Sequence, residues 1–186
     1  GDAEQFEKLV RAGATIARRI DRMDKPVIAA VNGPAAGAGA CLALACDLRI
    51  ASETASIGFT FIRVGLHPDW GGSYFLPRLI GPALAMELIL TGGMISSERA
   101  ERLGIFNRVV ASEDLEASAR TLAGQIAAGP AHLVTAIKRT LRRSLDSTLD
   151  EMLDLETAVQ LEAFGSPDFL EGITAFMEKR APRFGR

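Results

Sequence analysis

The sequence is poor in the features that mark several common classes of protein. It has only two cysteines among 186 residues, too few for a disulfide framework, which fits a reducing cytoplasm. No apolar run approaches the ~20 residues that a membrane-spanning helix needs, and the N-terminus lacks the pattern of a secretory signal. The net charge of −2 provides no basic field for nucleic acid or anionic lipid. We therefore expect a cytoplasmic protein that binds neither nucleic acid nor membrane.

The composition that remains is that of an ordinary globular protein. Apolar residues make up 48% and charged residues 24%, and 186 residues are enough for a hydrophobic core. Helical spacing of apolar residues predicts an amphipathic helix over residues 4–22. The continuously apolar run at 27–31 predicts a strand buried on both faces. Further short strands are expected at 47–51, 56–59 and 105–110.

Helices account for the rest of the predicted structure. The expected helices lie at about 41–45, at 73–80, from Gly81-Pro82 onward, after Ser96 or Ser97, and in four segments of the tail. Thr148-Leu149-Asp150-Glu151 forms a capping box for the third tail helix, and Ser166-Pro167 begins the fourth. The chain is thus divided into a β/α part, residues 1–110, and an all-α part, residues 111–186. The apolar stripes of the tail exceed what a small β/α core can cover, which indicates oligomerisation.

The first candidate site is Gly37-Ala38-Gly39, between a predicted strand and a predicted helix. Small residues let a ligand approach the backbone, and a helix N-terminus offers free N–H groups that suit a developing oxyanion. The alternative is a tight turn that needs small residues only for packing. The spacing fits neither a P-loop nor a dinucleotide fingerprint.

The second candidate is the loop His67-Pro68-Asp69-Trp70-Gly71-Gly72. An acid beside an indole, with little other charge nearby, is a plausible desolvated base with a raised pKa. The alternative is that Asp69 caps the following helix, a common role for Asp before glycines.

A third candidate is the basic and aromatic end of the chain, which contains Phe176 and Lys179. Such residues bind an anionic, stackable group such as a nucleotide, although most basic C-termini are simply solvated. The two histidines lack the carboxylate neighbours of a metal site, so no metal is expected. Cys41 and Cys46 lie among Leu and Ala, as core residues do.

These motifs occur in an order that resembles the enoyl-CoA hydratase/isomerase (crotonase) family. The matching segments are Lys25-Pro26-Val27-Ile28-Ala29-Ala30-Val31-Asn32-Gly33, Gly37-Ala38-Gly39, Leu42-Ala43-Leu44-Ala45-Cys46-Asp47, Gly58, Gly65, Pro68, Gly71-Gly72, Leu90-Thr91-Gly92 and Glu171-Gly172-Ile173-Thr174-Ala175-Phe176-Met177-Glu178-Lys179-Arg180. The resemblance implies an α/β fold, a spiral of ββα units followed by an α-helical region. It also implies an acyl-CoA thioester as substrate, no permanently bound cofactor, and a homo-trimer or hexamer.

The resemblance also implies that the opening ββα units, a second oxyanion donor and much of the CoA site belong to sequence before Gly1. One oxyanion donor would be the backbone N–H of Ala38, and losing its partner costs about 3 kcal/mol in the transition state, so these residues alone should be poorly active. The chain is expected to be either part of a longer protein or a degenerate member of the family.

Two glutamates that family hydratases use are replaced in this sequence. Residue matching puts Cys41 at the first position and Phe61 at the second, and neither a thiol among Leu and Ala nor a phenyl ring activates water. Asp69 matches the place where some isomerases of the family hold a catalytic aspartate. The ring-epoxide and dehydroadipyl-CoA isomerases of phenylacetate degradation are the branch that the sequence most resembles here, through Val64-Gly65-Leu66, Pro68-Asp69, Gly71-Gly72 and Leu76-Pro77-Arg78.

The resemblance makes an isomerase with Asp69 as its single base the leading hypothesis. The other residues that it places at the substrate are Gly37, Gly39, Cys41, Phe61, Trp70, Gly71, Phe176 and Lys179. One alternative is a hydratase or acyl-CoA hydrolase with non-standard residues. Another is a non-catalytic, CoA-binding paralogue.

Overall fold

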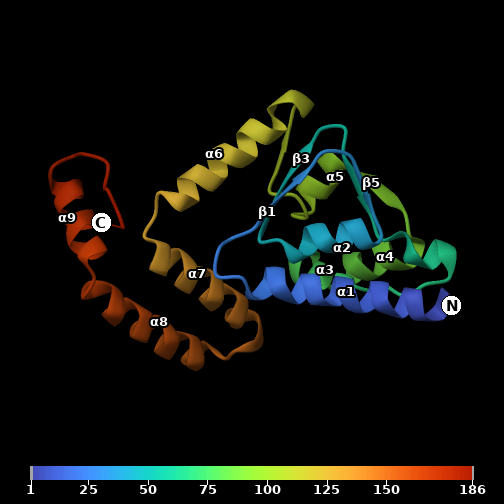
Figure 1. Cartoon of the computed structure of the whole chain (residues 1–186), viewed down its shortest axis with the longest axis horizontal. Coiled ribbons are helices and arrows are strands. Elements are labelled where there is room, and N and C mark those ends of the chain that lie inside the picture. Colours follow the sequence, from blue (N-terminus) through green and yellow to red (C-terminus); the bar gives the residue numbers. More distant parts are fainter. Residues whose placement is uncertain (1, 186) are drawn as a thin grey trace. The chain divides into compact units, whose positions relative to one another are not determined.

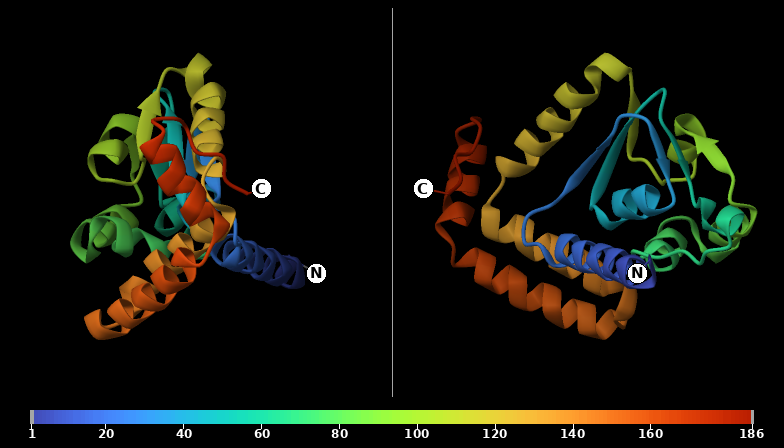
Figure 2. Two further views of the ribbon diagram at one scale, coloured as in Figure 1. Left: turned by 90° about the vertical axis from the view of Figure 1, so that its left-hand side faces the viewer. Right: turned by 45° about the vertical axis from the view of Figure 1, so that its right-hand side comes forward.

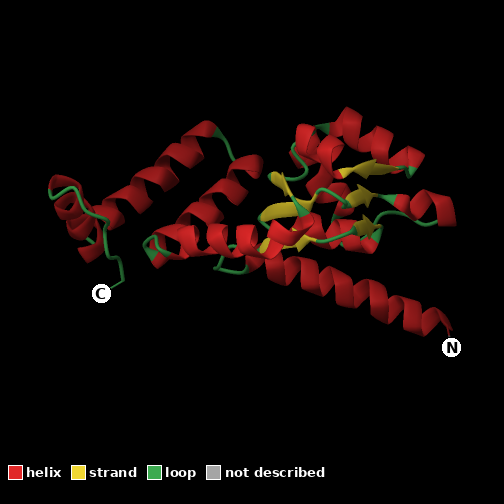
Figure 3. Cartoon of the chain, turned by 90° about the horizontal axis from the view of Figure 1, so that it is seen from above, coloured by secondary structure: helices red, strands yellow, loops and turns green. Residues whose placement is uncertain are grey.

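A computed structural model describes residues 2–185 and divides them into two compact units (Figure 1). The first unit comprises residues 2–23 and 27–120, and the second comprises residues 24–26 and 121–185. The first holds every strand of the described residues and the second is helical, as Figure 3 shows by colour. Each unit is described by itself.

The first unit combines short strands with helices. Its strands are β1 (Ile28–Val31), β2 (Pro34–Ala36), β3 (Leu48–Ser52), β4 (Ser56–Gly58), β5 (Met94–Ser96) and β6 (Arg108–Val110). Its α-helices are α1 (Asp2–Arg22), α2 (Ala38–Ala45), α3 (Gly72–Ile80), α4 (Pro82–Thr91), α5 (Ser97–Arg102) and the start of α6 (Leu115–Ala127). Two 3₁₀ helices, η1 (Thr60–Val64) and η2 (Ser112–Asp114), complete it.

The strands form two small sheets. In one, β3 lies between β1 and β6, and both neighbours run parallel to it. In the other, β4 pairs in parallel with β2 and antiparallel with β5. β2 follows β1 after a two-residue turn and leads through Gly37 into α2, so the N-terminus of α2 lies at the end of β2.

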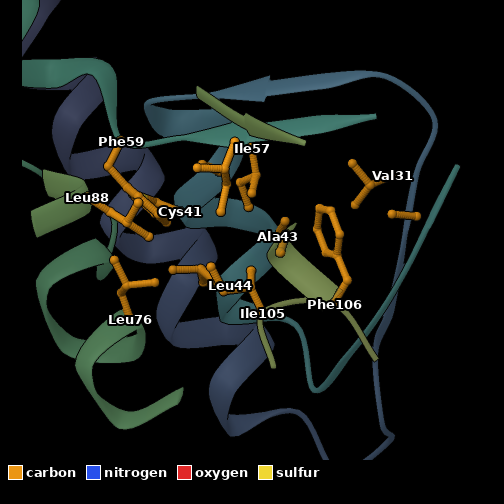
Figure 4. Packing of buried hydrophobic residues seen from close by; sticks show 14 of the residues in the cluster. Val31, Cys41, Ala43, Leu44, Ile57, Phe59, Leu76, Leu88, Ile105 and Phe106 are labelled. Carbon is orange, nitrogen blue, oxygen red and sulfur yellow. The ribbon is translucent and has the colours of Figure 1, made fainter. Parts of the chain in front are cut away.

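The core of the first unit surrounds α2, which consists almost entirely of small and apolar residues. Cys41 and Leu44 of α2 pack with Ile57 of β4, Leu76 of α3 and Leu88 of α4 (Figure 4). Cys41 is fully buried. Burial of a leucine-sized side chain stabilises a fold by about 1.5–3 kcal/mol, so these contacts hold α2 firmly within the first unit.

The second unit is a chain of helices joined by short turns (Figure 2). Its helices are the end of α6, α7 (Ala131–Arg143), η3 (Ser144–Asp146), α8 (Leu149–Phe164) and α9 (Pro167–Met177). Thr148 and Glu151 form the expected capping box of α8, and the side chain of Ser166 caps α9. Within this unit, Asp24 forms an ion pair of 2.5 Å with Arg139 of α7. None of the helices in residues 2–185 is long and apolar enough to cross a membrane.

Most predicted elements are confirmed, and four are corrected. The run at 27–31 forms the strand Ile28–Val31, but only Val31 is buried and Ala30 is exposed, so nothing among the described residues covers one face at Ala30 and the prediction of burial on both faces is wrong. β2 and β5 were not predicted, because three-residue strands carry no periodic signal. The strand predicted at 105–110 begins only at Arg108, because the N–H groups of Ile105 and Phe106 bond to the carbonyl of Ala100.

Candidate active site

The turn before α2 presents free backbone donors. Gly37 has a φ of 52° and a ψ of −116°, a conformation that favours glycine, and its N–H donates to the carbonyl of Gly58 over 2.9 Å. The Cys41 N–H then makes the first hydrogen bond of α2, to the carbonyl of Gly37. The N–H groups of Ala38 and Gly39 precede that bond and have no acceptor within the helix. Ala38 is half-buried and Gly39 is exposed, so this helix end is within reach of a ligand.

Asp69 lies in the loop before α3 and does not cap that helix. The N-cap is Gly71, at a φ of 90°, while the carbonyl of Asp69 accepts a hydrogen bond from the Gly72 N–H. The hypothesis that Asp69 is a helix cap is therefore wrong. Its side-chain Oδ1 is shut off from water and has no hydrogen-bond partner among the described residues. Desolvation raises the pKa of Asp69 above its ordinary value, against opposing contributions from its own backbone N–H and from His67.

Cys41 lies beside Asp69 and Gly72. A Cβ placed on Gly72 would come within 2.6 Å of the Cys41 Sγ, so the thiol occupies the space that a side chain at Gly72 would need. Burial raises the pKa of Cys41 to about 12, and the carboxylate of Asp69 contributes in the same direction. Cys41 is thus a neutral thiol at physiological pH, unsuited to nucleophilic attack or to activation of water.

Phe61, on η1, packs beside the turn at Gly37. The Cζ of its ring is 3.7 Å from a Cβ built on Gly37, and the Oγ1 of Thr60 is 3.6 Å from it. Phe61 is 7% exposed and belongs to the hydrophobic core. The environment of the α2 N-terminus therefore includes a phenyl ring and, one helical turn along, a neutral thiol.

Trp70 follows Asp69 and packs against α1. It has a φ of 48°, which is unusual for a bulky residue, and its buried Nε1 has no hydrogen-bond partner in the part of the chain that is described. A Cβ built on Gly13 of α1 would fall on the ring atoms of the indole. The sequence alone carries no signal for this contact, since Gly13 is one small residue in an apolar stripe.

Phe176 and Lys179 belong to the second unit, so their predicted role beside the substrate stays a prediction. Phe176, on α9, is 83% exposed. Lys179 follows the helix at a φ of 53°, and its side chain is exposed as well. The described residues contain no cluster of three or more His, Cys, Asp or Glu side chains that could hold a metal ion.

The sequence and the fold both match known proteins. A family model described as "Enoyl-CoA hydratase/isomerase" matches residues 4–186. The 1,2-epoxyphenylacetyl-CoA isomerase of Escherichia coli (strain K12) is 44% identical, over 91% of this chain and 64% of its own length. The crotonyl-CoA hydratase of Syntrophomonas wolfei is 37% identical, over 98% of this chain and 69% of its own length.

Solved structures also match the fold of the chain. The crystal structure of an enoyl-CoA hydratase from Bacillus anthracis superimposes with a TM-score of 0.94 at 38% identity, covering 97% of this chain and 70% of that one. The expected α/β crotonase fold is therefore confirmed for the part present, and the chain spans 64% of the length of the E. coli relative. The chain belongs to the enoyl-CoA hydratase/isomerase family.

Proposed function

We propose that the protein isomerises an acyl-CoA thioester, with the Asp69 carboxylate as its single acid–base group. The observation that carries the proposal is the Oδ1 atom of Asp69, which is shut off from water and has no hydrogen-bond partner in residues 2–185. A carboxylate with a desolvated, unpaired oxygen and a raised pKa is a stronger base than a fully solvated one. No other use of this side chain is evident, since it does not cap α3.

In this reaction Asp69 removes a proton alpha or gamma to the thioester carbonyl and returns it to another carbon. Negative charge moves onto the thioester oxygen as the proton leaves. The N–H of Ala38, at the positive end of α2, donates a hydrogen bond to that oxygen. One carboxylate suffices, because the proton that it removes is the one that it delivers. Coenzyme A is then part of the substrate, and no permanently bound cofactor takes part.

The residues at the two positions where family hydratases hold glutamates favour isomerisation over water addition. Hydration needs groups that activate water, whereas Cys41 is a neutral thiol and Phe61 is a buried phenyl ring. The alternative of a hydratase stays open because hydratases are similar to the chain at comparable identity, 37% in Syntrophomonas wolfei against 44% for the isomerase. A hydrolase and a non-catalytic CoA-binding protein are the remaining alternatives.

A panel of substrates tests the proposed reaction. The full-length protein is given 3-enoyl-CoA, 2-enoyl-CoA and the ring epoxide of phenylacetyl-CoA, and products are identified by mass and by chromatography. We expect products of unchanged mass from the 3-enoyl or the epoxide substrate. A product heavier by one water from 2-enoyl-CoA as the main activity would support the hydratase instead, and binding without any turnover would support the paralogue.

The pH dependence of turnover is expected to follow Asp69. The base works only when ionised, and desolvation raises its pKa above the ordinary 3.8, so activity should fall as the pH drops through a value higher than 3.8. The measurement is kcat against pH, with protein stability checked at each pH. A rate that stays constant down to pH values below 3.8 would contradict the assignment of Asp69 as base.

We propose a second role, CoA recognition, for Phe176 and Lys179. The exposed ring can stack on adenine, and the ammonium group can offset phosphate charge, on a ligand of the same or of a neighbouring subunit. Lys179→Ala should weaken CoA binding and reduce its dependence on salt, as measured by calorimetry at two ionic strengths. Unchanged affinity and salt dependence would leave this segment with a packing role only.

We also propose that the protein assembles as a homo-trimer or hexamer. Large apolar side chains are exposed in each unit, among them Val64 (72%) and Leu90 (63%) in the first and Leu161 (65%) and Leu170 (66%) in the second. Such surface is usually covered in an oligomer. Light scattering at micromolar concentration should give the mass of three or six subunits, and a monodisperse monomer would contradict the proposal.

A further inference from the structure

Gly13 occupies a place in α1 where only glycine fits. It lies in the middle of a 21-residue helix, and glycine is the least favourable residue other than proline in a helix interior. It is also buried. A Cβ at this position would fall on the Cε2, Nε1 and Cδ2 atoms of Trp70, so the indole lies directly on the helix backbone. An alanine here would favour the helix itself but would displace the indole.

Trp70 depends on this contact because its own backbone conformation is unfavourable. A positive φ in a bulky residue persists only where the surrounding packing holds it, and here Trp70 packs on the core of the first unit and on α1. The next residue, Gly71, is also left-handed and serves as the N-cap of α3. The indole and the start of α3 are therefore fixed together.

Asp69 is part of the same turn. Its carbonyl accepts the Gly72 N–H at the start of α3, and its Oδ1 is shut off from water. Buried, unpartnered polar atoms therefore occur on two consecutive residues, Oδ1 of Asp69 and Nε1 of Trp70. A shift of the indole would move the turn that carries Asp69 and open it to water.

We propose that Gly13 is a positioning residue for the reaction at Asp69, because its missing side chain lets the indole of Trp70 lie on α1 and hold the Asp69 turn in a closed, dry position. This inference rests on the proposed function. Gly13 contacts no reacting atom, and its effect passes through Trp70. The role is distinct from that of a glycine needed for a turn, since Gly13 is helical.

Tryptophan fluorescence tests the packing step without any measurement of activity. Trp70 is the single tryptophan of the 186 residues, and subtracting the spectrum of a Trp70→Phe variant removes emission from any tryptophan elsewhere in the full-length protein. Gly13→Ala should shift the Trp70 emission to longer wavelength. The matched control is Gly124→Ala, because Gly124 is also helical and has nothing within 4 Å of a built Cβ. An unshifted Gly13→Ala spectrum would overturn the inference.

Kinetics test the functional step. Gly13→Ala should lower kcat by about 10²-fold, the usual cost of a small misplacement, with little change in KM. Gly124→Ala should keep the wild-type kcat. Trp70→Ala at an intact Gly13 should cause a comparable loss, and adding Gly13→Ala to it should cost little more, because the clash is already gone. Full kcat in Gly13→Ala, or losses that simply multiply, would overturn the inference.

Two further outcomes separate this inference from the proposed function. If Asp69→Asn is inactive while Gly13→Ala and Trp70→Ala keep full kcat, the positioning role is wrong and the assignment of Asp69 stands. If Asp69→Asn keeps full activity, the proposed base is wrong, and the positioning role falls with it even where the emission of Trp70 shifts. Should Gly13→Ala fail to fold, the kcat of Trp70→Ala tests the inference: a loss of about 10²-fold supports it, and a wild-type kcat overturns it.

Discussion

Asp69→Asn is expected to lower the isomerisation rate by about 10²–10⁴-fold while acyl-CoA binding stays nearly intact. The change keeps the size and shape of the side chain and removes its basicity. Cys41→Ala and Phe61→Leu are expected to alter the rate much less, because neither residue transfers a proton. The measurement is kcat and KM on the substrate that the panel identifies, with CoA-ester affinity measured separately.

The thermal stability of the Asp69→Asn variant is the control for its loss of rate. Desolvation raises the pKa of Asp69, so the folded protein holds the proton more tightly than the unfolded chain does. The stability that this group contributes is present below pH 3.8, the ordinary pKa that it has in the unfolded chain. That stability is lost as the pH rises through the higher pKa of the folded protein. At neutral pH the ionised carboxylate therefore costs stability, and Asp69→Asn should keep or raise the Tm. A rate loss that comes with a lower Tm and weaker binding would point to a structural role.

Ala38→Pro is expected to reduce kcat by about 10²–10³-fold, the effect of removing one oxyanion donor. Proline deletes a single N–H group, and the first residue of a helix is where it is best tolerated. The preceding residue must also suit proline. Gly37 has a φ of 52° and a ψ of −116°, the mirror image of the extended conformation that residues before proline adopt, and glycine is achiral, so the two are equivalent for it.

Ala38→Gly is the matched control for this variant, since it changes the same side chain but keeps the N–H group. It should retain a kcat close to that of the wild type. Both variants should show the wild-type circular dichroism spectrum. If Ala38→Pro folds and turns over at the wild-type rate, the α2 N-terminus does not stabilise the charge that develops on the thioester.

The fold could be predicted from the sequence wherever an element is long or carries a cap. The apolar spacing in residues 4–22, the capping box at Thr148 and the Pro82 that begins α4 each correspond to a helix in the structure. The three-residue strands β2 and β5 could not be predicted, because each pairs with a distant partner in β4. Pro34 of β2 pairs with Ser56, 22 residues away, and Ile95 of β5 pairs with Ile57, 38 residues away. Tertiary pairing, not local preference, makes them strands.

The candidate site could be predicted only in part. The residues alone mark Asp69 and the Gly37 turn as candidates, each beside a structural alternative, and it is the resemblance to the family that favours Asp69 as the base. That Asp69 does not cap α3 could not be foreseen, since it depends on the left-handed backbone of Trp70 and Gly71. The role of Gly13 could not be foreseen either, because a helical pattern gives the face of a residue but not the side chain that packs on it.

Transfer of an isotope label tests the central claim, a single base at Asp69 that returns the proton it removes. The substrate is 3-enoyl-CoA deuterated at the alpha carbon, and the product is examined by NMR and mass spectrometry after less than one turnover. The account predicts deuterium at the gamma carbon of the 2-enoyl product made by the wild type, and no such product from Asp69→Asn. A hydrated product, or label transfer that survives in Asp69→Asn, would contradict it.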